Sequence, residues 1–345
     1  MLIDWVSFKY PLIEFSRDQV EYLRTTSDHI IRYCPRTGDI KYETSAWESI
    51  KSDSHQVSFH VGSTHLKIQG SPGRAIGDGD AVFGSDPCST LSIFGCIMAM
   101  SKHVSKVLDI LLPKNPLLYE VTRVDVTSNL LLHSLTDVKS ALTILRNCEG
   151  GRYRVSQQCG DTVYWSHSST LRSGKAYAKG PQLNKLMKKK NYTGRGYSIQ
   201  EIELADRLLR LELKLGCEFF RRNDWRCMIP EYLNNQWESY FMRMIGDSRL
   251  KTDDDVRIRI FETAKREGKT PGAARAAYLC WSAIKNEGWE QARELYNKRT
   301  WYRHKKLLSN TGLGDADISV GRVVGLKIVE AEHISSWEQL RNQVA

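Results

Sequence analysis

The stretch "VSFHVGSTHLKIQ", residues 57–69, alternates apolar and polar residues on both sides of a Gly-Ser-Thr turn. Val57, Phe59 and Val61 are the apolar positions before the turn, and Leu66 and Ile68 follow it. A period of two places alternate side chains on opposite faces of a strand. The stretch therefore predicts a β-hairpin with one buried face.

The same order of elements recurs further along the chain. The hairpin is followed by a Gly-rich loop, an apolar helix-compatible stretch and a strand, at residues 70–86, 89–112 and 119–132. After a short helix over 135–147, a second hairpin, helix and strand follow, at residues 161–180, 198–206 and 208–215. Both hairpins end near a Gly/Pro step. We predict a weak internal duplication within an α+β fold that has a curved, mostly antiparallel sheet.

Each half closes on a strand that carries an arginine and an acid two residues apart. The first strand has Arg123 and Asp125, and the second, "LLRLELKL", has Arg210 and Glu212. In the second strand, leucines alternate with these polar residues, so the arginine and the acid share the face opposite the core. The duplication places the two strands side by side. A merely polar outer face remains the alternative to a site.

After about residue 226 the sequence changes to helical patterns. Thr270 can cap a helix that starts at Pro271 and ends at Gly288. Residues 289–312 then predict two short helices, the second rich in Arg299, Arg303, Lys305 and Lys306. The pair could be a helix-turn-helix that reads duplex DNA, or a small bundle with a solvated basic face. We predict a catalytic domain over 1–225 and a helical DNA-binding domain over 226–345.

Composition narrows the class of partner. The 345 residues carry a formal net charge of +10, which favours a polyanion such as nucleic acid. No apolar run is long enough to span a bilayer, and the N-terminus lacks the basic region of a signal peptide. The eight cysteines are scattered without a CxxC pair, which indicates reduced thiols in a cytosolic protein.

The positive charge is concentrated around one tyrosine. Residues 162–200 contain no acid and eight cations: Arg172, Lys175, Lys179, Lys185, Lys188, Lys189, Lys190 and Arg195. Tyr177 lies between Lys175 and Lys179. An ordinary tyrosine has a pKa near 10, so only about 0.1% of it is phenolate at neutral pH. The flanking ammonium groups are expected to favour the charged form.

These residues suit phosphoryl transfer. Two carboxylates, Asp125 and Glu212, together with a phosphate oxygen suit a hard cation such as Mg²⁺ or Mn²⁺. Each acid follows an arginine on its strand, which is expected to favour its ionised form. Attack of Tyr177 on a DNA phosphodiester would give a covalent phosphotyrosyl link. The chain lacks a phosphate loop and an HExxH motif, and His60 or His65 could still complete the metal site.

An ordered set of motifs resembles the filamentous-phage gene II replication proteins, and more distantly the rolling-circle initiators of plasmids. The motifs are "MLIDWVSFKYP", "LKIQGSPGRAIGDGDAVFGS", "TRVDVT", "TVYWSHSSTLRSGKAYAKGPQL" and "LLRLELKL", which span roughly residues 1–222. The tail, with "KTPGAARAAY" and "RTWYRHKKLL", is similar more loosely. One departure is the sequence Gly79-Asp80-Ala81, where the family usually has Gly-His-Asn.

The resemblance implies an enzyme that nicks one strand at a replication origin. Tyr177 would be its nucleophile with Lys179 beside it, and Asp125 and Glu212 would hold Mg²⁺ or Mn²⁺. The partner would be origin DNA, single-stranded or supercoiled, in the cytoplasm of the host bacterium. A host helicase, a homodimer, a role for Asp80 and a second nucleophile at Tyr164, Tyr192 or Tyr197 are left open.

We therefore predict a nicking endonuclease and strand-transferase that starts rolling-circle replication of a phage genome through a 5′-phosphotyrosyl intermediate. The alternatives are a non-enzymatic origin-binding initiator or repressor, and an RNA-binding protein. The residues expected to hold DNA are Lys175, Lys188, Lys189, Lys190, Arg195, Arg299, Arg303 and Lys305. Phosphate contacts of this kind position the DNA but carry no sequence information.

Overall fold

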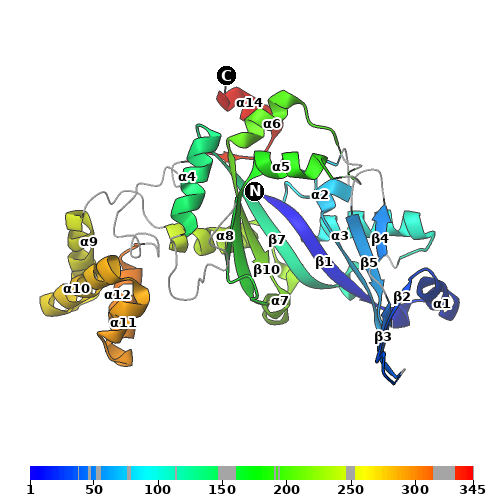
Figure 1. The fold of residues 1–345 in the computed structure, drawn as a ribbon, viewed down its shortest axis with the longest axis horizontal. Helices are drawn as coiled ribbons and strands as arrows, with labels where there is room; N and C mark the ends of the chain where they lie inside the picture. The colour runs from blue at the N-terminus through cyan, green and yellow to red at the C-terminus, as the bar shows by residue number, and fades with distance from the viewer. Residues whose placement is uncertain are drawn as a thin grey trace.

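A computed structural model gives the fold shown in Figure 1. It describes the whole chain except residues 38, 46–47, 52–55, 76–78, 113–114, 147–160, 190–191, 193–194, 246–252, 314–330 and 345. Within the described residues, no helix is long and apolar enough to cross a membrane.

A large antiparallel sheet forms the centre of the molecule, in the strand order β4-β5-β6-β1-β7-β10-β9-β8. Its strands are β1 (Leu2–Pro11), β4 (Glu48–Lys51), β5 (Gln56–Val61), β6 (His65–Gly70), β7 (Glu120–Leu131), β8 (Thr162–Trp165), β9 (Arg172–Ala178) and β10 (Leu208–Leu215). The short strand β11 (His333–Ile334) also pairs with β7. A separate hairpin consists of β2 (His29–Tyr33) and β3 (Ile40–Ser45). The α+β fold with a mostly antiparallel sheet is confirmed.

The two halves have the predicted order of elements but differ in pairing. The first hairpin, β5–β6, is followed by α2 (Pro72–Ala75), α3 (Ile93–Leu108) and β7, and the second, β8–β9, by α5 (Lys179–Met187), α6 (Ile199–Asp206) and β10. In the second half β10 pairs directly with β9, whereas in the first half β1 lies between β6 and β7. Strands β7 and β10 are neighbours, as the duplication predicts.

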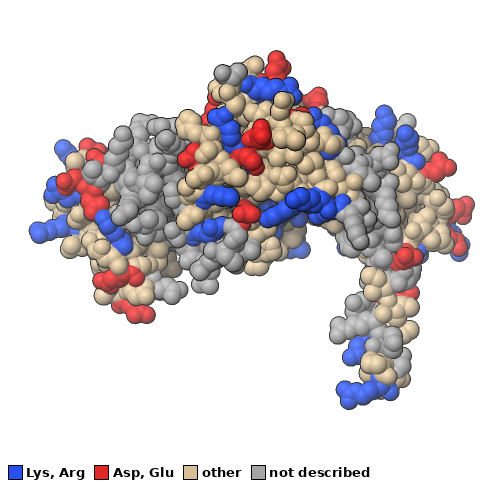
Figure 2. Space-filling model, turned by 45° about the horizontal axis from the view of Figure 1, so that its top comes forward, with Lys and Arg blue, Asp and Glu red and all other residues tan. Residues whose placement is uncertain are grey.

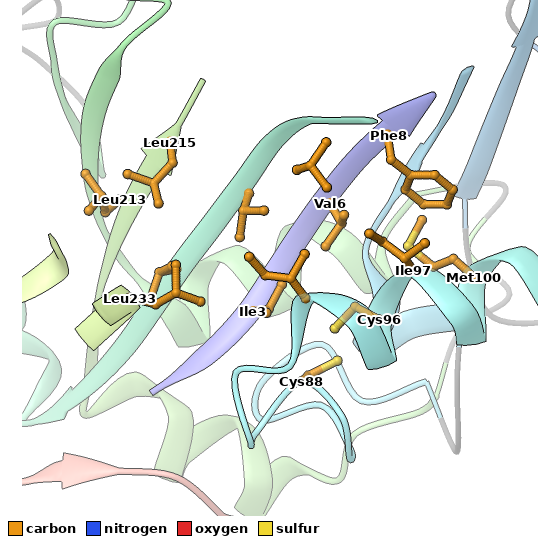
Figure 3. Packing of buried hydrophobic residues seen from close by; sticks show 14 of the residues in the cluster. Ile3, Val6, Phe8, Cys88, Cys96, Ile97, Met100, Leu213, Leu215 and Leu233 are labelled. Atoms are coloured by element: carbon orange, nitrogen blue, oxygen red, sulfur yellow. The ribbon is translucent and has the colours of Figure 1, made fainter. Parts of the chain in front are cut away.

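Leucine, isoleucine and valine side chains cover one face of the sheet. Figure 3 shows Ile3, Val6 and Phe8 of β1 beside Ile97 and Met100 of α3. All of these side chains are almost completely buried. Because side chains alternate along a strand, this packing leaves the opposite face of the same strands to polar residues.

The helix α8 (Pro230–Ile245) belongs to the same core as the sheet. Leu233, Trp237 and Phe241 of α8 lie in one apolar cluster with the sheet, and the Trp237 indole donates to the Leu211 carbonyl at 3.2 Å. Gly174 of β9 lies so close to Tyr240 that an added Cβ would be 2.6 Å from its ring. The region beyond residue 226 therefore includes a helix that completes the sheet domain.

A second apolar core is built by α9 (Asp253–Arg266), α10 (Pro271–Glu287), α11 (Trp289–Glu294) and α12 (Lys298–Asn310). Figure 1 shows these helices grouped away from the sheet. Thr270 caps α10 with Pro271 as its first residue, and Gly288 ends it with a φ of +86°, as predicted. The division into a catalytic and a DNA-binding domain stays a prediction, and this packing places the separate helical core at 253–313.

The remaining α-helices of the described residues are α1 (Arg17–Thr25), α4 (Leu135–Arg146), α7 (Cys217–Arg222) and α14 (Trp337–Val344). Helices α5, α6 and α14 share a third apolar cluster with residues 81–83. Its buried members include Phe83, Leu183 and Leu340. The C-terminal segment thus packs at the same end of the sheet as the helix that follows β9.

We expect Leu233→Ala to lower the free energy of unfolding by about 2–5 kcal/mol, because it removes a fully buried side chain from the core shared by α8 and the sheet. The measurement is urea unfolding followed by circular dichroism. Asn235→Ala, at an exposed position of the same helix, is the control and should change stability by less than about 0.5 kcal/mol. Equal stabilities of the two variants would contradict the packing of α8 on the sheet.

Candidate active site

The sheet's second face carries the predicted site residues in register. Tyr177 of β9 pairs with Arg210 of β10, and Lys175 pairs with Glu212. On the other side of β10, Asp125 of β7 pairs with Lys214. Tyr177, Glu212 and Asp125 therefore lie on one face of three adjacent strands.

Tyr177 is buried among charged groups. Its side chain is absent from the apolar clusters of the described residues, although the residue is only 5% exposed. Its hydroxyl donates to Glu212 Oε2 at 3.3 Å, and the Lys175 ammonium lies 4.3 Å from the ring centre. Lys175 Nζ is itself 3.4 Å from Glu212 Oε2. The structure thus places a hydroxyl, a carboxylate and an ammonium in mutual contact.

The protonation expected for Tyr177 is wrong. Burial raises its pKa to about 12, although Arg210 and Lys175 act in the opposite direction. The flanking cations were expected to favour the phenolate, but removal of the oxygen from water outweighs them. In the protein without DNA, Tyr177 is a neutral hydrogen-bond donor.

Arg210 lies at the centre of this face and is completely buried. Its Nε donates to Asn129 Oδ1 at 2.8 Å, and Nη1 donates to the Ala81 carbonyl at 3.2 Å. Nη2 donates to the Val82 carbonyl, and Nη1 lies 3.4 Å from Asp4 Oδ1. Arg210 therefore holds the loop that follows Asp80 against β7 and the start of β1.

Asp125 is also buried, and Arg123 binds its carboxylate with two N–H groups, Nε at 2.8 Å and Nη2. Burial nevertheless raises the pKa of Asp125 to about 7, and the charges of Glu212 and Asp4 add to the shift. The expectation that Arg123 alone would keep this acid ionised is therefore wrong. The positive charge of Arg123 therefore does not fully compensate the negative charge of the acids around Asp125.

Asp4 is a site residue that sequence reasoning missed. It falls in the irregular step between Ile3 and Trp5 where β1 pairs with β7. The negative charge of Asp4 acts to raise the pKa of Asp125, Lys175, Tyr177 and Arg210. The signal in the sequence was an acid inside a first strand in which Lys9 is the one other charged residue.

The acidic side chains at this site have the type of oxygen ligand that binds a divalent cation. Asp125, Glu212 and Asp4 supply carboxylate oxygens, which Mg²⁺ and Mn²⁺ prefer, and the raised pKa of Asp125 marks negative charge that a cation would compensate. Among the described residues, however, no three His, Cys, Asp or Glu side chains are arranged as a metal site. A metal would need Arg123 or Lys175 to give up part of its contact with these carboxylates.

The histidines considered for this site lie elsewhere on the face. His60 of β5 pairs with Lys67 of β6, in the row that continues through Lys9 to Glu120. His65 Nε2 is 4.0 Å from Glu120 Oε1. This row is separated from Asp125 by the row of Arg123 and Ser7, so neither imidazole is grouped with Asp125 or Glu212.

Asp80 has a structural setting. Its carboxylate accepts hydrogen bonds from the Tyr197 hydroxyl at 2.9 Å and the Trp337 indole at 2.8 Å. Arg195 lies over the Tyr197 and Trp337 rings, 3.8 Å from Asp80 and 2.7 Å from Glu201. Asp80 therefore ties α14 to the loop that Arg210 holds.

The remaining predicted residues are distributed around the site. Lys179 is fully buried at the start of α5, with Nζ 2.9 Å from Gln182 and 6.0 Å from the Tyr177 ring centre. Gly180 and Pro181 are in the first turn of α5 and not in a loop. Lys188 and Lys189 are exposed after the helix, and Lys190 lies outside the described residues.

The three other tyrosines differ in position. Tyr164 pairs with Lys175 and shares the face of Tyr177. The Tyr197 hydroxyl also accepts from the Ala81 amide at 2.6 Å, and burial raises its pKa. The Tyr192 hydroxyl donates to the Arg195 carbonyl at 2.8 Å. Of these three tyrosines, Tyr164 therefore lies nearest to Tyr177 in the strand register.

On α12, Trp301, His304 and Leu308 face the helical core. Arg299 and Arg303 are exposed, and Lys305 lies over the Trp289 ring with Nζ 5.2 Å from its centre. Figure 2 shows further Lys and Arg side chains around a few acids in the middle of the face it presents. These placements are compatible with the predicted DNA contacts, which stay predictions.

Comparison with known proteins identifies the family. The Phage_CRI family model, which describes the N-terminal part of a replication-associated protein, matches residues 2–239 of this chain, well over half of it. The chain belongs to this family. The replication-associated protein of Enterobacteria phage I2-2 is 25% identical over 371 aligned residues, which cover 99% of this chain and 97% of that protein.

Among solved structures, the rolling circle replication initiator protein from Geobacillus stearothermophilus matches 62% of this chain and 73% of its own. The sequence identity of that match is 11% and the TM-score is 0.25.

We expect Arg210→Leu to lower the free energy of unfolding by about 3–5 kcal/mol, because it leaves buried acceptors at Asn129, Ala81 and Val82 without a donor. The control is Arg221→Ala, which removes an exposed ion pair to Glu218 and should cost less than about 1 kcal/mol. The measurement is chemical denaturation of both variants. A small loss at Arg210 would mean that its contacts do not hold the loop.

Proposed function

We propose that this protein initiates rolling-circle replication of a phage genome by nicking one DNA strand at the origin. The observation that carries the proposal is the contact of the Tyr177 hydroxyl with Glu212, beside the Lys175 ammonium and the buried Arg210. Membership of the family of phage replication-associated proteins supplies the replication context. The site of action would be the cytoplasm of the host bacterium.

In the proposed step, the Tyr177 oxygen attacks a phosphodiester phosphorus. The new bond joins the Tyr177 oxygen to phosphorus, and the bond from phosphorus to the 3′ oxygen breaks. The leaving 3′ oxygen takes a proton from water, so the product is a 5′-phosphotyrosyl link with a free 3′ hydroxyl. Glu212 already accepts the Tyr177 hydrogen bond, so it is the nearest acceptor for the hydroxyl proton. The phosphoester energy is conserved, so a later attack by a 3′ hydroxyl can reseal the strand.

Two cations, the buried Arg210 and the partly exposed Lys175, would offset the charge that develops on the phosphate. Arg210 pairs with Tyr177 across the strands, and the Lys175 ammonium is nearer to its ring than the Lys179 ammonium is. We therefore assign the electrostatic role to Arg210 and Lys175, and keep Lys179 as a buried support at the start of α5.

Asp125 and Glu212 would hold Mg²⁺ or Mn²⁺, with Asp4 as a third nearby carboxylate. When bound, the cation would supply charge stabilisation to a phosphate oxygen. Lys188, Lys189, Lys190 and the exposed cations of α12 would hold the DNA backbone outside the site. A host helicase and a second copy of the chain remain further candidate partners.

A non-enzymatic origin-binding initiator or repressor is the competing function, and it would retain the basic surface without using Tyr177. An RNA-binding protein is the second competitor. Both predict that no covalent adduct forms with DNA, so one assay decides between them and the nickase.

We expect Tyr177→Phe to abolish covalent adduct formation and to keep DNA affinity within about threefold, because only the attacking oxygen is lost. The protein is incubated with a labelled single-stranded origin oligonucleotide and Mn²⁺, and adducts are counted on a denaturing gel. Tyr164→Phe, on the same face, is the matched control and should still form the first adduct. An adduct with Tyr177→Phe would move the nucleophile to another tyrosine.

We expect Asp125→Asn or Glu212→Gln to reduce nicking by at least about 10–100-fold while DNA binding is unchanged or tighter, because each change removes one negative charge and one cation ligand. EDTA should reduce nicking by the unmodified protein in the same way. Glu238→Gln on the outside of α8 is the control. Equal nicking in EDTA and in Mn²⁺ would show that these carboxylates have a structural role and do not hold a catalytic cation.

A further inference from the structure

A cavity of about 430 Å³ opens on the polar face of the sheet, next to the site but outside it. Strands β6, β1, β7 and β10 contribute to its lining, together with residues 168–170 and the start of α7. The volume is in the range of sites that hold one small molecule. A volume of this size can accommodate a short stretch of a single extended chain.

All charged side chains that line the cavity are positive. Lys9, Lys67, Arg123 and Lys214 line the cavity, and no acid is among its lining residues. Two of the cations have carboxylate partners at the rim, Lys9 with Glu120 at 2.8 Å and Arg123 with Asp125. Within the described part of the chain, neither Lys67 nor Lys214 forms an ion pair. The lining thus offers positive charge that a phosphate would compensate.

Neutral polar groups complete the lining. The side chains of Ser7, Gln69 and Thr122, with the loop 168–170, place hydroxyl and amide groups around the cations. The Ser7 hydroxyl donates to Gln69 Oε1 at 3.4 Å and the Thr122 hydroxyl donates to the Ser7 carbonyl at 3.1 Å, so these two hydroxyls can accept hydrogen bonds but already use their protons. Arg123 has five N–H donors and uses two of them on Asp125, so others are available for an anion. Hydroxyls, amides and cations together are the groups that bind sugar–phosphate backbones.

The wall formed by residues 168–170 is fixed in place. The Thr170 carbonyl accepts from the Glu218 amide at 3.1 Å, and the Leu171 carbonyl accepts from the Gly216 amide at 3.0 Å. A Cβ at Gly216 would be 2.2 Å from the Thr170 oxygen, so only glycine allows this approach. The cavity is therefore a preformed groove between this loop and the sheet.

The groove is continuous with the candidate active site. Lys214 pairs with Asp125 across β10 and β7, and Arg123 contacts both the cavity and the Asp125 carboxylate. Along the face, the order is Tyr177, then Glu212, then Asp125 with Lys214, then Arg123, then Lys67. A strand whose phosphate lies at Tyr177 would meet these cations next.

We propose that this groove binds the phosphodiester backbone of the single DNA strand that Tyr177 attacks, on one side of the scissile phosphate. The proposal rests on the nicking function proposed above and adds the path of the substrate. Positively charged grooves that follow the backbone are the usual means of holding single strands. Recognition here is of the phosphates, so it applies to origin and non-origin strands alike.

The test compares two charge-matched double variants. Lys67→Ala/Lys214→Ala removes the two unpaired cations of the groove, and Lys102→Ala/Lys106→Ala removes two exposed lysines from α3, which packs on the opposite face of the sheet. Both are made in the Tyr177→Phe protein, so that no strand is cut. Binding of a labelled single-stranded oligonucleotide is measured by fluorescence anisotropy from about 0.05 to about 1 M KCl, with circular dichroism to verify folding.

For the groove variant we expect the slope of log affinity against log salt to flatten by about 1.4, since each lost single-strand phosphate contact is worth about 0.7. This corresponds to about 25-fold weaker binding at about 0.1 M KCl, with convergence toward the parent near about 1 M. The α3 variant should keep the parent slope. Equal slopes in the two variants, or a loss seen only with duplex DNA, would overturn the proposal.

A native thiol provides an independent readout. Cys217 lines the groove and is partly exposed, and Cys34, in the β2–β3 hairpin, is a partly exposed control. Saturating single-stranded oligonucleotide should slow alkylation of Cys217 by N-ethylmaleimide at least tenfold and leave Cys34 unchanged, as read by mass spectrometry. Unchanged alkylation of Cys217 would overturn the groove. Neither assay requires cleavage, so a failure of the nicking function would be seen separately in the adduct gel.

Discussion

The burial of one guanidinium, that of Arg210, is the constraint on which the rest of the active face depends. A charged group without water is tolerable only when its donors are satisfied. Arg210 meets this requirement with Asn129 of β7, two carbonyls of the loop at residues 81–82, and Asp4 of β1. It also stands opposite Tyr177 in the β9–β10 pair. Three segments of the chain are therefore fixed relative to the proposed nucleophile by the hydrogen bonds of one side chain.

The same constraint connects the C-terminus to the site. Asp80 precedes the two carbonyls that Arg210 binds, and its carboxylate is held by Tyr197 and Trp337. The strand β11 then pairs with β7 beside Asn129. The last helix, α14, therefore stabilises the loop that satisfies Arg210. This explains in physical terms why an aspartate stands at Asp80: its two oxygens accept from two donors that come from distant parts of the sequence.

Local pattern was sufficient to predict much of the fold and the composition of the site. Alternation in 57–69 and 208–215 gave the strands, and cap residues gave the limits of α10. Arg210 and Glu212 alternate with leucines along β10, so they were predicted to lie on the face opposite the leucines. What could not be predicted depends on contacts between distant segments. Three features follow from tertiary packing and burial: the position of β1 between β6 and β7, the contact of Asp4 with Arg210, and the direction of the pKa shift of Tyr177. Counting charges along the sequence does not show which groups are buried or which distant segments meet.

The protonation of Tyr177 and the basic groove are best understood together. Burial raises the pKa of Tyr177 to about 12, and a phosphate brought beside it would add negative charge, which disfavours the phenolate further. Attack therefore requires compensating positive charge at the oxygen and a base for its proton. Lys175, Arg210 and Glu212 are within the site to supply these, but Lys175 and Glu212 pair with each other, and Arg210 donates to Asn129, two loop carbonyls and Asp4. Additional cations in the site would compete for Asp125 and Glu212 with the proposed metal. With Lys67 and Lys214 in a neighbouring groove, the protein would bind the strand without adding a further cation beside Tyr177 and Glu212.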